Sequence, residues 1–348
     1  MSDVSTELLS NHTTLRLGGP AGRFVTATST DELVDAVRRA DEAGDDLLVL
    51  AGGSNLVVAD DGFPGTVVKV ATTGIATDGD SDPEGASCGG VLVTVAAGET
   101  WDDLVARAVD AGWVGIEALS GIPGSVGATP IQNVGAYGQE VAQTVASVRV
   151  WDRTLQGVRT FANADCGFGY RHSRFKADPS RHVVLSVTFQ FRQGSLGAPV
   201  TYAELARTLG VEQGQRAPLA DVREAVLGLR TGKGMVLDPA DHDTWSAGSF
   251  FTNPVVAADD VPDGAPAWPQ PDGRAKTSAA WLIEHAGFGK GYGNGVVGLS
   301  TKHTLALTNR GGASTGDLVA LAREVRAGVE AKFGIRLVNE PVLVGCEL

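Results

Sequence analysis

Apolar residues recur at helical spacing in several stretches of the chain. Asp31, a residue type that caps helices, is followed by four apolar residues that would share one helical face: Leu33, Val34, Val37 and Ala40. The same spacing predicts four further helices: Thr100–Ala111, Leu219–Gly228, Ser278–Ala286 and Thr315–Phe333. Gly112, directly after the first of these four, suits the left-handed position that ends a helix.

Short runs of β-branched and aromatic residues predict strands between these helices. They are Arg23–Ala27, Leu47–Leu50, Thr66–Val70, Val91–Ala97, Ser147–Trp151, Val183–Phe191 and Arg336–Val344. Strands and helices do not alternate strictly, which favours an α+β fold over a doubly wound sheet. The length of 348 residues indicates two or three domains.

Four polar stretches interrupt the pattern and are interpreted as loops. Asp78–Gly90 is acidic and poor in apolar residues, and Gly167–Lys176 is polar and cationic. Arg230–Asp238 follows a predicted helix, and Val261–Pro271 is a proline-rich surface excursion. We therefore expect irregular backbone in all four.

Composition narrows the class of protein. The net charge of −13 argues against nucleic acid as a partner. No secretory signal is visible, and no apolar run reaches the roughly 20 residues that span a bilayer, so we expect a cytoplasmic protein without membrane insertion. The 3 cysteines and 6 histidines are dispersed, which predicts neither a disulfide framework nor a metal site.

Glycine is concentrated where the candidate chemistry lies. The 46 glycines are about 13% of the chain, against a usual share of about 7%. Ala51–Asn55 is a glycine loop directly after an apolar strand, and Gly112–Gly138 is a second glycine-rich stretch. Together they could cradle a pyrophosphate with backbone N–H groups, although ordinary turns remain the alternative for either loop.

Two common nucleotide motifs do not apply. Gly293–Gly298 satisfies G-x-G-x-x-G, but it has neither a buried strand before it nor a helical pattern after it. We expect a flexible loop there. The sequence contains no Walker A motif, which excludes a P-loop nucleotide hydrolase.

Four motifs, in the family's order, resemble the UDP-N-acetylenolpyruvoylglucosamine reductase family. The first is a flavin cradle made of Ala51–Leu56, Ile122–Gly127 and Pro130–Gly138, and the others are Phe168–Ser173, Ala247–Pro254 and Asn339–Pro341. The resemblance covers essentially the whole chain. It implies the FAD-binding fold of the vanillyl-alcohol-oxidase type, with two α+β flavin-binding subdomains and a C-terminal α+β substrate-binding domain. The implied borders are 1–76, 77–238 with 336–348 returning to the active site, and 239–335.

The resemblance also implies the cofactors and their ligands. FAD would be reduced by NADPH, although no nicotinamide-specific motif is visible. The implied flavin-binding residues are Gly52, Gly53, Ser54, Asn55, Ile122, Pro123, Gly124, Ser125, Gly127, Gln132, Asn133, Gly135, Ala136 and Tyr137.

Three residues match the family's catalytic positions. Hydride addition to the enolpyruvyl group leaves an enolate, which needs positive charge near the carboxylate and an acid at the neighbouring carbon. Arg171 would hold the carboxylate as a guanidinium fork, and Glu340 would polarise it. Ser249 would be the general acid, a role for which a serine needs activating neighbours. The alternatives are a surface arginine, a salt-bridge glutamate and a turn serine.

Five residues match substrate-binding positions: Tyr202, Lys233, Asn253, Trp268 and Lys276. Thr201–Leu205 resembles the tyrosine loop that one branch of the family closes over the nucleotide. Lys233 stands in a longer loop than the shortest family version. Trp268 stands at a uridine-contacting position where the family often has tyrosine. A tryptophan there can still stack on the uridine, but it cannot make the hydrogen bond of the tyrosine hydroxyl.

The resemblance implies reduction of UDP-N-acetylenolpyruvoylglucosamine to UDP-N-acetylmuramate for peptidoglycan, and hence for cell-wall growth, cell shape and division. The substrate and NADPH would be the only partners of a monomeric enzyme. Two other classes stay open: a sugar or alcohol oxidase with the same flavin fold, and a non-catalytic flavin or UDP-sugar sensor. Gly112–Gly138 has no His or Cys to attach flavin covalently, and a sensor would not need the catalytic trio.

Overall fold

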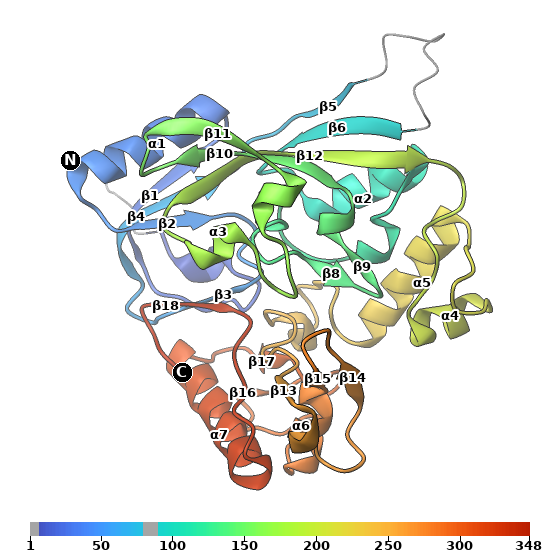
Figure 1. Ribbon diagram of the computed structural model, residues 1–348. Helices are drawn as coiled ribbons and strands as arrows, with labels where there is room; N and C mark the ends of the chain where they lie inside the picture. Colours follow the sequence, from blue (N-terminus) through green and yellow to red (C-terminus); the bar gives the residue numbers. More distant parts are fainter. Residues whose placement is uncertain (1–6, 79–89) are drawn as a thin grey trace. The chain divides into compact units, whose positions relative to one another are not determined.

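The structure, a computed structural model, describes residues 7–78 and 90–348 (Figure 1). Most of the loop expected at Asp78–Gly90 lies outside these residues. The chain forms two compact units. Unit 1 comprises residues 1–22, 53–64 and 232–348, and unit 2 comprises residues 23–52 and 65–231. The three-part division at 76 and 238 stays a prediction.

Unit 2 is built on an antiparallel sheet. Its strands follow the order β11 (Gly157–Ala162), β10 (Val145–Asp152), β12 (His182–Gln193), β6 (Gly90–Ala96) and β5 (Ile75–Asp78). The short β7 (Trp113–Val114) pairs with the end of β12. Side chains alternate along β6, where Val91, Val93 and Val95 are buried, as a half-covered antiparallel sheet requires.

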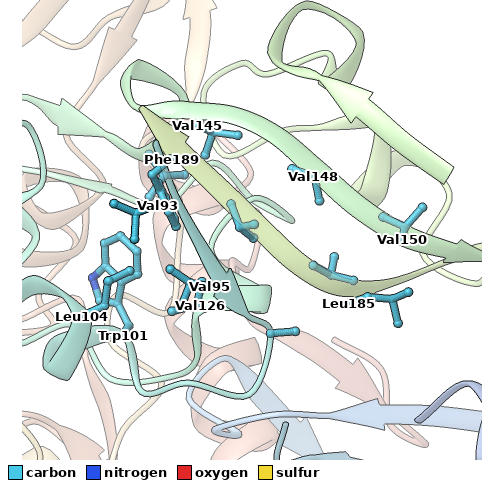
Figure 2. Packing of buried hydrophobic residues seen from close by; sticks show 14 of the residues in the cluster. Val93, Val95, Trp101, Leu104, Val126, Val145, Val148, Val150, Leu185 and Phe189 are labelled. Atoms are coloured by element: carbon cyan, nitrogen blue, oxygen red, sulfur yellow. The ribbon is translucent and has the colours of Figure 1, made fainter. Parts of the chain in front are cut away.

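Helix α2 (Trp101–Asp110) supplies the other half of this core. Trp101 and Leu104 are fully buried and lie against the sheet near Val93 and Phe189 (Figure 2). The indole Nε1 of Trp101 donates to the carbonyl of Leu119 at 3.1 Å, so its polar atom is satisfied. Truncating this tryptophan to alanine would cost about 3–5 kcal/mol. The predicted helix end is confirmed, since Gly112 has φ +71°.

A second sheet has the order β1 (Ala21–Ala27), β4 (Phe63–Val70) and β2 (Leu47–Leu50), with β2 and β4 parallel. Helix α1 (Thr30–Ala43) connects β1 to β2 and buries Leu33, Val37 and Ala40, as the spacing predicted. The predicted cap was wrong. Ser29 caps α1, because its extended backbone lets its hydroxyl accept from the N–H of Glu32, whereas Asp31 lies in the first turn.

The rest of unit 2 consists of α3 (Arg174–Ala177), α4 (Ala203–Leu209), α5 (Leu219–Gly232) and the hairpin of β8 (Gly135–Ala136) and β9 (Gln139–Glu140). The loop predicted from Arg230 was wrong at its start, because α5 continues to Gly232. Val222, Val226 and Arg230 recur every four residues and are buried, so packing extends the helix past Gly228. The cationic stretch 167–176 also contains the start of α3.

Unit 1 contains α6 (Ala279–His285) and α7 (Thr315–Phe333), both where the sequence predicted them. Ser314 caps α7 in a reciprocal capping box with Asp317. A three-stranded antiparallel sheet has the order β13 (Val255–Ala257), β15 (Arg274–Thr277) and β14 (Ala267–Pro269). The excursion expected at 261–271 therefore includes a strand, and that strand is exposed.

Two further strand pairs complete unit 1. β16 (Val297–Leu299) and β17 (Leu307–Asn309) are antiparallel, and β18 (Val342–Val344) runs parallel to β3 (Leu56–Val58). The strand predicted at Arg336–Val344 is confirmed only over its last three residues. The loop expected at Gly293–Gly298 was wrong over its last two residues, which pair with β17 as part of β16. No helix follows directly, so the segment lacks the context of a dinucleotide-binding turn.

Within the described part of the chain, five 3₁₀ segments of three residues and two of four residues connect these elements. They are Leu9–His12, Glu117–Leu119, Val126–Ala128, Val141–Gln143, Asn163–Cys166, His242–Thr244 and Ala258–Asp260. Among the residues that the structure describes, no helix is both long and apolar enough to cross a membrane.

Candidate active site

The two glycine loops predicted as a cradle touch each other in unit 2. A Cβ on Gly52 would lie 2.7 Å from the Cα of Gly124, closer than real Cβ atoms approach backbone. Gly124 has φ +120°, a conformation that only glycine adopts without strain. Two loops far apart in sequence therefore meet at positions where neither residue could carry a side chain.

The connection between β6 and α2 fixes the loop of Gly124. The carbonyl of Gly124 accepts from the N–H of Trp101 at 3.0 Å. The N–H of Gly127 donates to the carbonyl of Ala97 at 2.8 Å, and a Cβ on Gly127 would lie 2.5 Å from the Cβ of Ala97. The loop is thus held by backbone contacts on both sides of Gly124–Ser125.

Asp102, in the first turn of α2, holds the start of the same loop. Its carboxylate accepts from the N–H of Gly121 at 2.5 Å and binds both terminal nitrogens of Arg223, at 2.7 and 2.9 Å. Burial raises the pKa of Asp102, but the hydrogen bonds from Arg223 and Gly121 outweigh it, so the pKa lies below its usual value. Asp102 is therefore ionised at neutral pH.

Ser125 fits a cofactor at this loop. Its side-chain Oγ is buried and has no hydrogen-bond partner among the described residues. A buried hydroxyl without a partner is costly, so it marks a place where a ligand atom is expected. Ile122 and Pro123, in the same loop, are half-buried. These features fit the flavin cradle that the sequence predicted.

The third cradle motif folds as the β8–β9 hairpin. Tyr137 and Gly138 form its turn with φ of +48° and +87°, the positive pair typical of a two-residue hairpin loop. Asn133 is buried with φ +48°, and its amide donates to Glu140 at 2.8 Å and to the carbonyl of Gly169 at 3.1 Å. Asn133 therefore joins this hairpin to the turn that carries Arg171. Gln132 is half-buried and Ala136 lies in β8.

Arg171 lies against the cradle. Its Nη2 donates to the carbonyl of Gly135 at 2.9 Å, and a Cβ on Gly135 would lie 3.4 Å from its Nη1. The residue has φ +51°, and Lys176 donates to its carbonyl at 3.1 Å. Ser173 Oγ donates to the carbonyl of Ile131 at 2.5 Å, which ties the whole turn to the cradle segment. Of the trio, Arg171 belongs to unit 2.

The predicted tyrosine loop is also in unit 2. Tyr202 stands directly before α4 and is 47% exposed, with its ring edge-on to that of Tyr137 at a centroid distance of 5.5 Å. A predicted substrate residue and a predicted flavin residue are thus in contact. An exposed aromatic held in this way can present a flat surface to a ligand.

In unit 1, Gly53–Asn55 meets the segment of Glu340. The side-chain amide of Asn55 donates to the backbone carbonyl of Glu340 at 3.4 Å, and the backbone carbonyl of Asn55 accepts from the N–H of Val342 at 2.9 Å. Gly53 has φ +59°, and a Cβ there would lie 1.8 Å from the carbonyl of His12. Ser54, between them, is half-buried.

Ser249 and Glu340 lie on adjoining segments of unit 1. The N–H of Glu340 donates to the carbonyl of Phe250 at 2.8 Å, and Phe251 forms a bridge with Asn339. The N–H of Phe250 donates to the carbonyl of Leu305 at 2.7 Å, which fixes the backbone next to Ser249 from the other side. The two candidate catalytic residues of unit 1 are therefore neighbours in space.

The remaining substrate residues lie in unit 1. Trp268 and Lys276 pair across β14 and β15, and the Lys276 Nζ lies 5.9 Å from the Trp268 ring centroid. Asn253 accepts from the N–H of Ala279 at 3.0 Å and so also caps α6. Lys233 follows α5, and the methyl of Met235 in its loop would lie 3.8 Å from a Cβ on Gly248, next to Ser249.

Several polar residues near the cradle were not found from the sequence. Arg230 is 6% exposed on α5, and burial lowers its pKa to about 10, while Tyr137 and Asp102 favour its charge. It is therefore a buried cation at neutral pH. Asp102 and Glu117 are the other two. The signal for Glu117 would have been an acid placed within an apolar run, Ile116-Glu117-Ala118. Among the described residues, no group of three or more His, Cys, Asp or Glu could hold a metal ion.

Comparisons with known proteins agree with this geometry. Residues 21–157 match the FAD binding domain family, and residues 238–344 match the family described as UDP-N-acetylenolpyruvoylglucosamine reductase, C-terminal domain. The flavin and the α+β flavin-binding fold predicted from the sequence are thereby confirmed.

Whole-chain relatives carry the same description. The UDP-N-acetylenolpyruvoylglucosamine reductase of Cutibacterium acnes is 60% identical over 97% of this chain and 89% of its own length. That of Streptomyces avermitilis is 60% identical over 97% of this chain and 93% of its own. The crystal structure of the Thermus caldophilus reductase matches with a TM-score of 0.63 at 25% identity, and covers 98% of each chain.

Proposed function

Because the chain belongs to the UDP-N-acetylenolpyruvoylglucosamine reductase family, we propose that it reduces UDP-N-acetylenolpyruvoylglucosamine to UDP-N-acetylmuramate. NADPH is the reductant and FAD the bound cofactor, and the product serves peptidoglycan synthesis. One hydride and one proton are added across the enolpyruvyl double bond, while NADPH becomes NADP⁺. The observation that carries the proposal is the contact of the glycine loops at Gly52 and Gly124, within a chain 60% identical to relatives of that description.

Bound FAD would supply the hydride-transfer chemistry that links NADPH to the enolpyruvyl double bond. The loop of Gly124 and Ser125 and the hairpin of Gly135 would hold it. Their backbone approaches closely because glycine stands at the contact positions, and the buried Ser125 hydroxyl offers a donor.

Arg171 binds the carboxylate of the enolpyruvyl group. A guanidinium has five N–H donors in a planar fork, which matches the two oxygens of a carboxylate. The hydrogen bond from its Nη2 to Gly135 orients the fork, and Asn133 fixes the turn beneath it. Charge that develops on the carboxylate during hydride addition is stabilised by this fixed cation. Glu340, in unit 1, matches the family position that polarises the substrate carboxylate.

Ser249 supplies the proton. An enolate formed by hydride addition needs a proton at the carbon next to the carboxylate, and a positioned general acid contributes about 10²–10⁴-fold to such a step. Both backbone polar groups of Phe250, the residue after Ser249, are hydrogen-bonded, one to Leu305 and the other to Glu340, which fixes the backbone next to Ser249. A serine is a weak acid, so this role requires neighbouring groups that stabilise its alkoxide or relay a proton through water.

Substrate binding uses the remaining predicted residues. The exposed ring of Trp268 and the half-buried Lys276 form a pair of ring and cation that suits a nucleobase and a phosphate. Lys233 and Asn253 serve the diphosphate and the sugar, and Tyr202 covers the nucleotide. The monomeric state and the cytoplasmic location expected from the sequence stay predictions, and light scattering after gel filtration measures the former.

An anaerobic absorption experiment tests the function. FAD-loaded protein is mixed with NADPH and then with UDP-N-acetylenolpyruvoylglucosamine. We expect the flavin colour to bleach with NADPH and to return with the enolpyruvyl sugar. Bleaching without return would favour the oxidase class, and failure to bind flavin would favour a sensor.

The variant Ser249→Ala separates the two half-reactions. Bleaching by NADPH should keep the wild-type rate, whereas return of colour with the sugar should slow by about 10²–10⁴-fold. Ser180→Ala, which alters an exposed serine of unit 2, is the control and should change neither rate. Turnover by Ser249→Ala at the wild-type rate would contradict the role of Ser249 as proton donor.

A further inference from the structure

Glu117 is a buried carboxylate outside the predicted site. Glu117 is 1% exposed, and its two carboxylate oxygens accept three hydrogen bonds. Oε2 accepts from the N–H of Gly115 at 2.7 Å. Oε1 accepts from the side chain of Gln139 at 2.8 Å and from the N–H of Ala198 at 2.6 Å. A buried charge is stable only when it is satisfied in this way.

The three donors come from three segments of unit 2. Gly115 precedes Glu117 itself, Gln139 begins β9 directly after the Tyr137–Gly138 turn, and Ala198 leads to the tyrosine loop. Gln139 completes the network by accepting from the N–H of Ala118 at 2.8 Å. One carboxylate therefore joins the cradle hairpin to the base of the tyrosine loop.

The tyrosine loop lies within a longer excursion, residues 196–218. The two ends of this excursion, 196–200 and 214–218, are hydrogen-bonded to each other and are called the neck. Leu196 forms a bridge with Pro218, and Gly197 donates to the carbonyl of Ala217 at 2.8 Å. Val200 exchanges two backbone hydrogen bonds, with Gln215 and Gly214, each 2.8 Å long. Ala198 lies within this neck, so a hydrogen bond from its N–H to Glu117 fixes the neck as a whole.

Beyond the neck, the loop rests on the cradle hairpin. A Cβ on Gly138 would lie 2.2 Å from the hydroxyl of Thr201, so the two segments are in close contact. The next residue, Tyr202, meets the ring of Tyr137 edge-on. The position of Tyr202 thus depends on how the neck is held relative to the hairpin.

We propose that Glu117 is a positioning residue that holds the tyrosine loop through the N–H of Ala198, and so places Tyr202 for the UDP moiety of the substrate. The inference rests on the proposed function, because it assigns a use to Tyr202 in substrate binding. Glu117 touches neither substrate nor flavin. It acts on substrate affinity and leaves reduction by NADPH unchanged.

Two nearly isosteric variants separate this role from a general structural one. In Glu117→Gln, the amide oxygen keeps the place of Oε1 and still accepts from Gln139 and Ala198, while the bond to Gly115 is lost. In the swap Glu117→Gln with Gln139→Glu, the new carboxylate at 139 draws the amide nitrogen of 117 to the place of Oε1. The side-chain pair and the Gly115 bond are then kept, but the N–H of Ala198 loses its acceptor. Each variant forfeits one backbone hydrogen bond.

The experiment measures KM for UDP-N-acetylenolpyruvoylglucosamine, the rate of flavin reduction by NADPH, and amide hydrogen exchange at Ala198. We expect the swap to raise KM about tenfold, the factor equivalent to about 1.4 kcal/mol, which is close to the value of one hydrogen bond to a charged group. Glu117→Gln should stay within about twofold of wild type, and flavin reduction should be unchanged in both. Glu212→Gln, an exposed carboxylate on the same excursion, is the control.

Hydrogen exchange keeps the test independent of turnover. The amide of Ala198 should be protected in wild type and in Glu117→Gln, and should exchange faster in the swap. Equal KM values for the two variants, or fast exchange at Ala198 in wild type, would overturn the proposal. If wild type does not turn over the sugar but Ala198 still exchanges as expected in all variants, the proposed function is wrong. The hydrogen bond from Ala198 to Glu117 is then still shown to hold the neck.

Discussion

Gly52→Ala tests the contact between the two glycine loops. The added Cβ would lie 2.7 Å from the Cα of Gly124 and 3.2 Å from its carbonyl carbon. Carbon atoms pack at about 3.5–4.0 Å, so the loops must separate by about 1 Å. Gly52 is not among the residues with positive φ, so the backbone conformation itself adds no cost.

The expected magnitude follows from this overlap. Forcing an extra carbon into a packed contact costs about 1–3 kcal/mol. If the loops move apart to relieve it, FAD binding must bring them back, and its affinity should fall by about fivefold to a hundredfold. The dissociation constant is measured by titrating apoprotein with FAD and following the flavin fluorescence, and thermal unfolding of the apoprotein reports on folding.

Gly228→Ala is the matched control. It makes the same chemical change in unit 2, on α5, where a new Cβ meets nothing within 4 Å. It should leave FAD affinity unchanged and stabilise the helix by about 0.5–1 kcal/mol. If Gly52→Ala is folded and binds FAD as tightly as wild type, the loops do not jointly form the flavin site and the reasoning is refuted.

Three other predictions concern stability and reactivity. Burial lowers the pKa of His182 despite the nearby Asp152, so unfolding takes up a proton and wild type should lose stability as pH falls through about 6.5; denaturant titrations should show a flatter dependence between pH 7 and 5 for His182→Gln. Burial raises the pKa of Cys166 to about 11, so iodoacetamide at pH 8 should leave it unmodified in the native protein by mass spectrometry, and rapid labelling would contradict its burial. Ser314→Ala removes the cap of α7 and should cost about 0.5–2 kcal/mol in urea unfolding without altering FAD affinity, so an unchanged midpoint would count against the cap.

The local sequence pattern was enough to predict elements in which apolar residues recur at the same spacing over several turns. Helix α7 carries apolar residues over five turns and a polar cap, and its predicted bounds match the structure. Signals of a single residue were weaker. Asp31 and Ser29 are both cap formers, and only the backbone conformation around them decides which one caps. Arg230 reads as a loop residue until Val222 and Val226 are seen to bury the same face of α5.

Pairings between distant segments were beyond sequence reasoning. Only Val342–Val344 of the predicted C-terminal strand is paired regularly, because its partner β3 is three residues long, and Asn339 instead meets Phe251. The candidate site came from resemblance rather than from spacing. The meeting of Gly52 with Gly124 and the orphaned hydroxyl of Ser125 give that site a physical basis, while the roles of its residues remain predictions.

The parallel pairing of β18 with β3 has a consequence for the order in which the protein matures. Unit 2 is completed by residue 231, so a nascent chain can fold it while later residues are still being added. Unit 1 is complete only when Val342–Val344 pairs with Leu56–Val58, a contact of very long sequence separation. The frame around Glu340 and Ser249 therefore arises last. Partly synthesised chains would acquire the flavin-loop contact of unit 2 before they acquire the proposed proton donor.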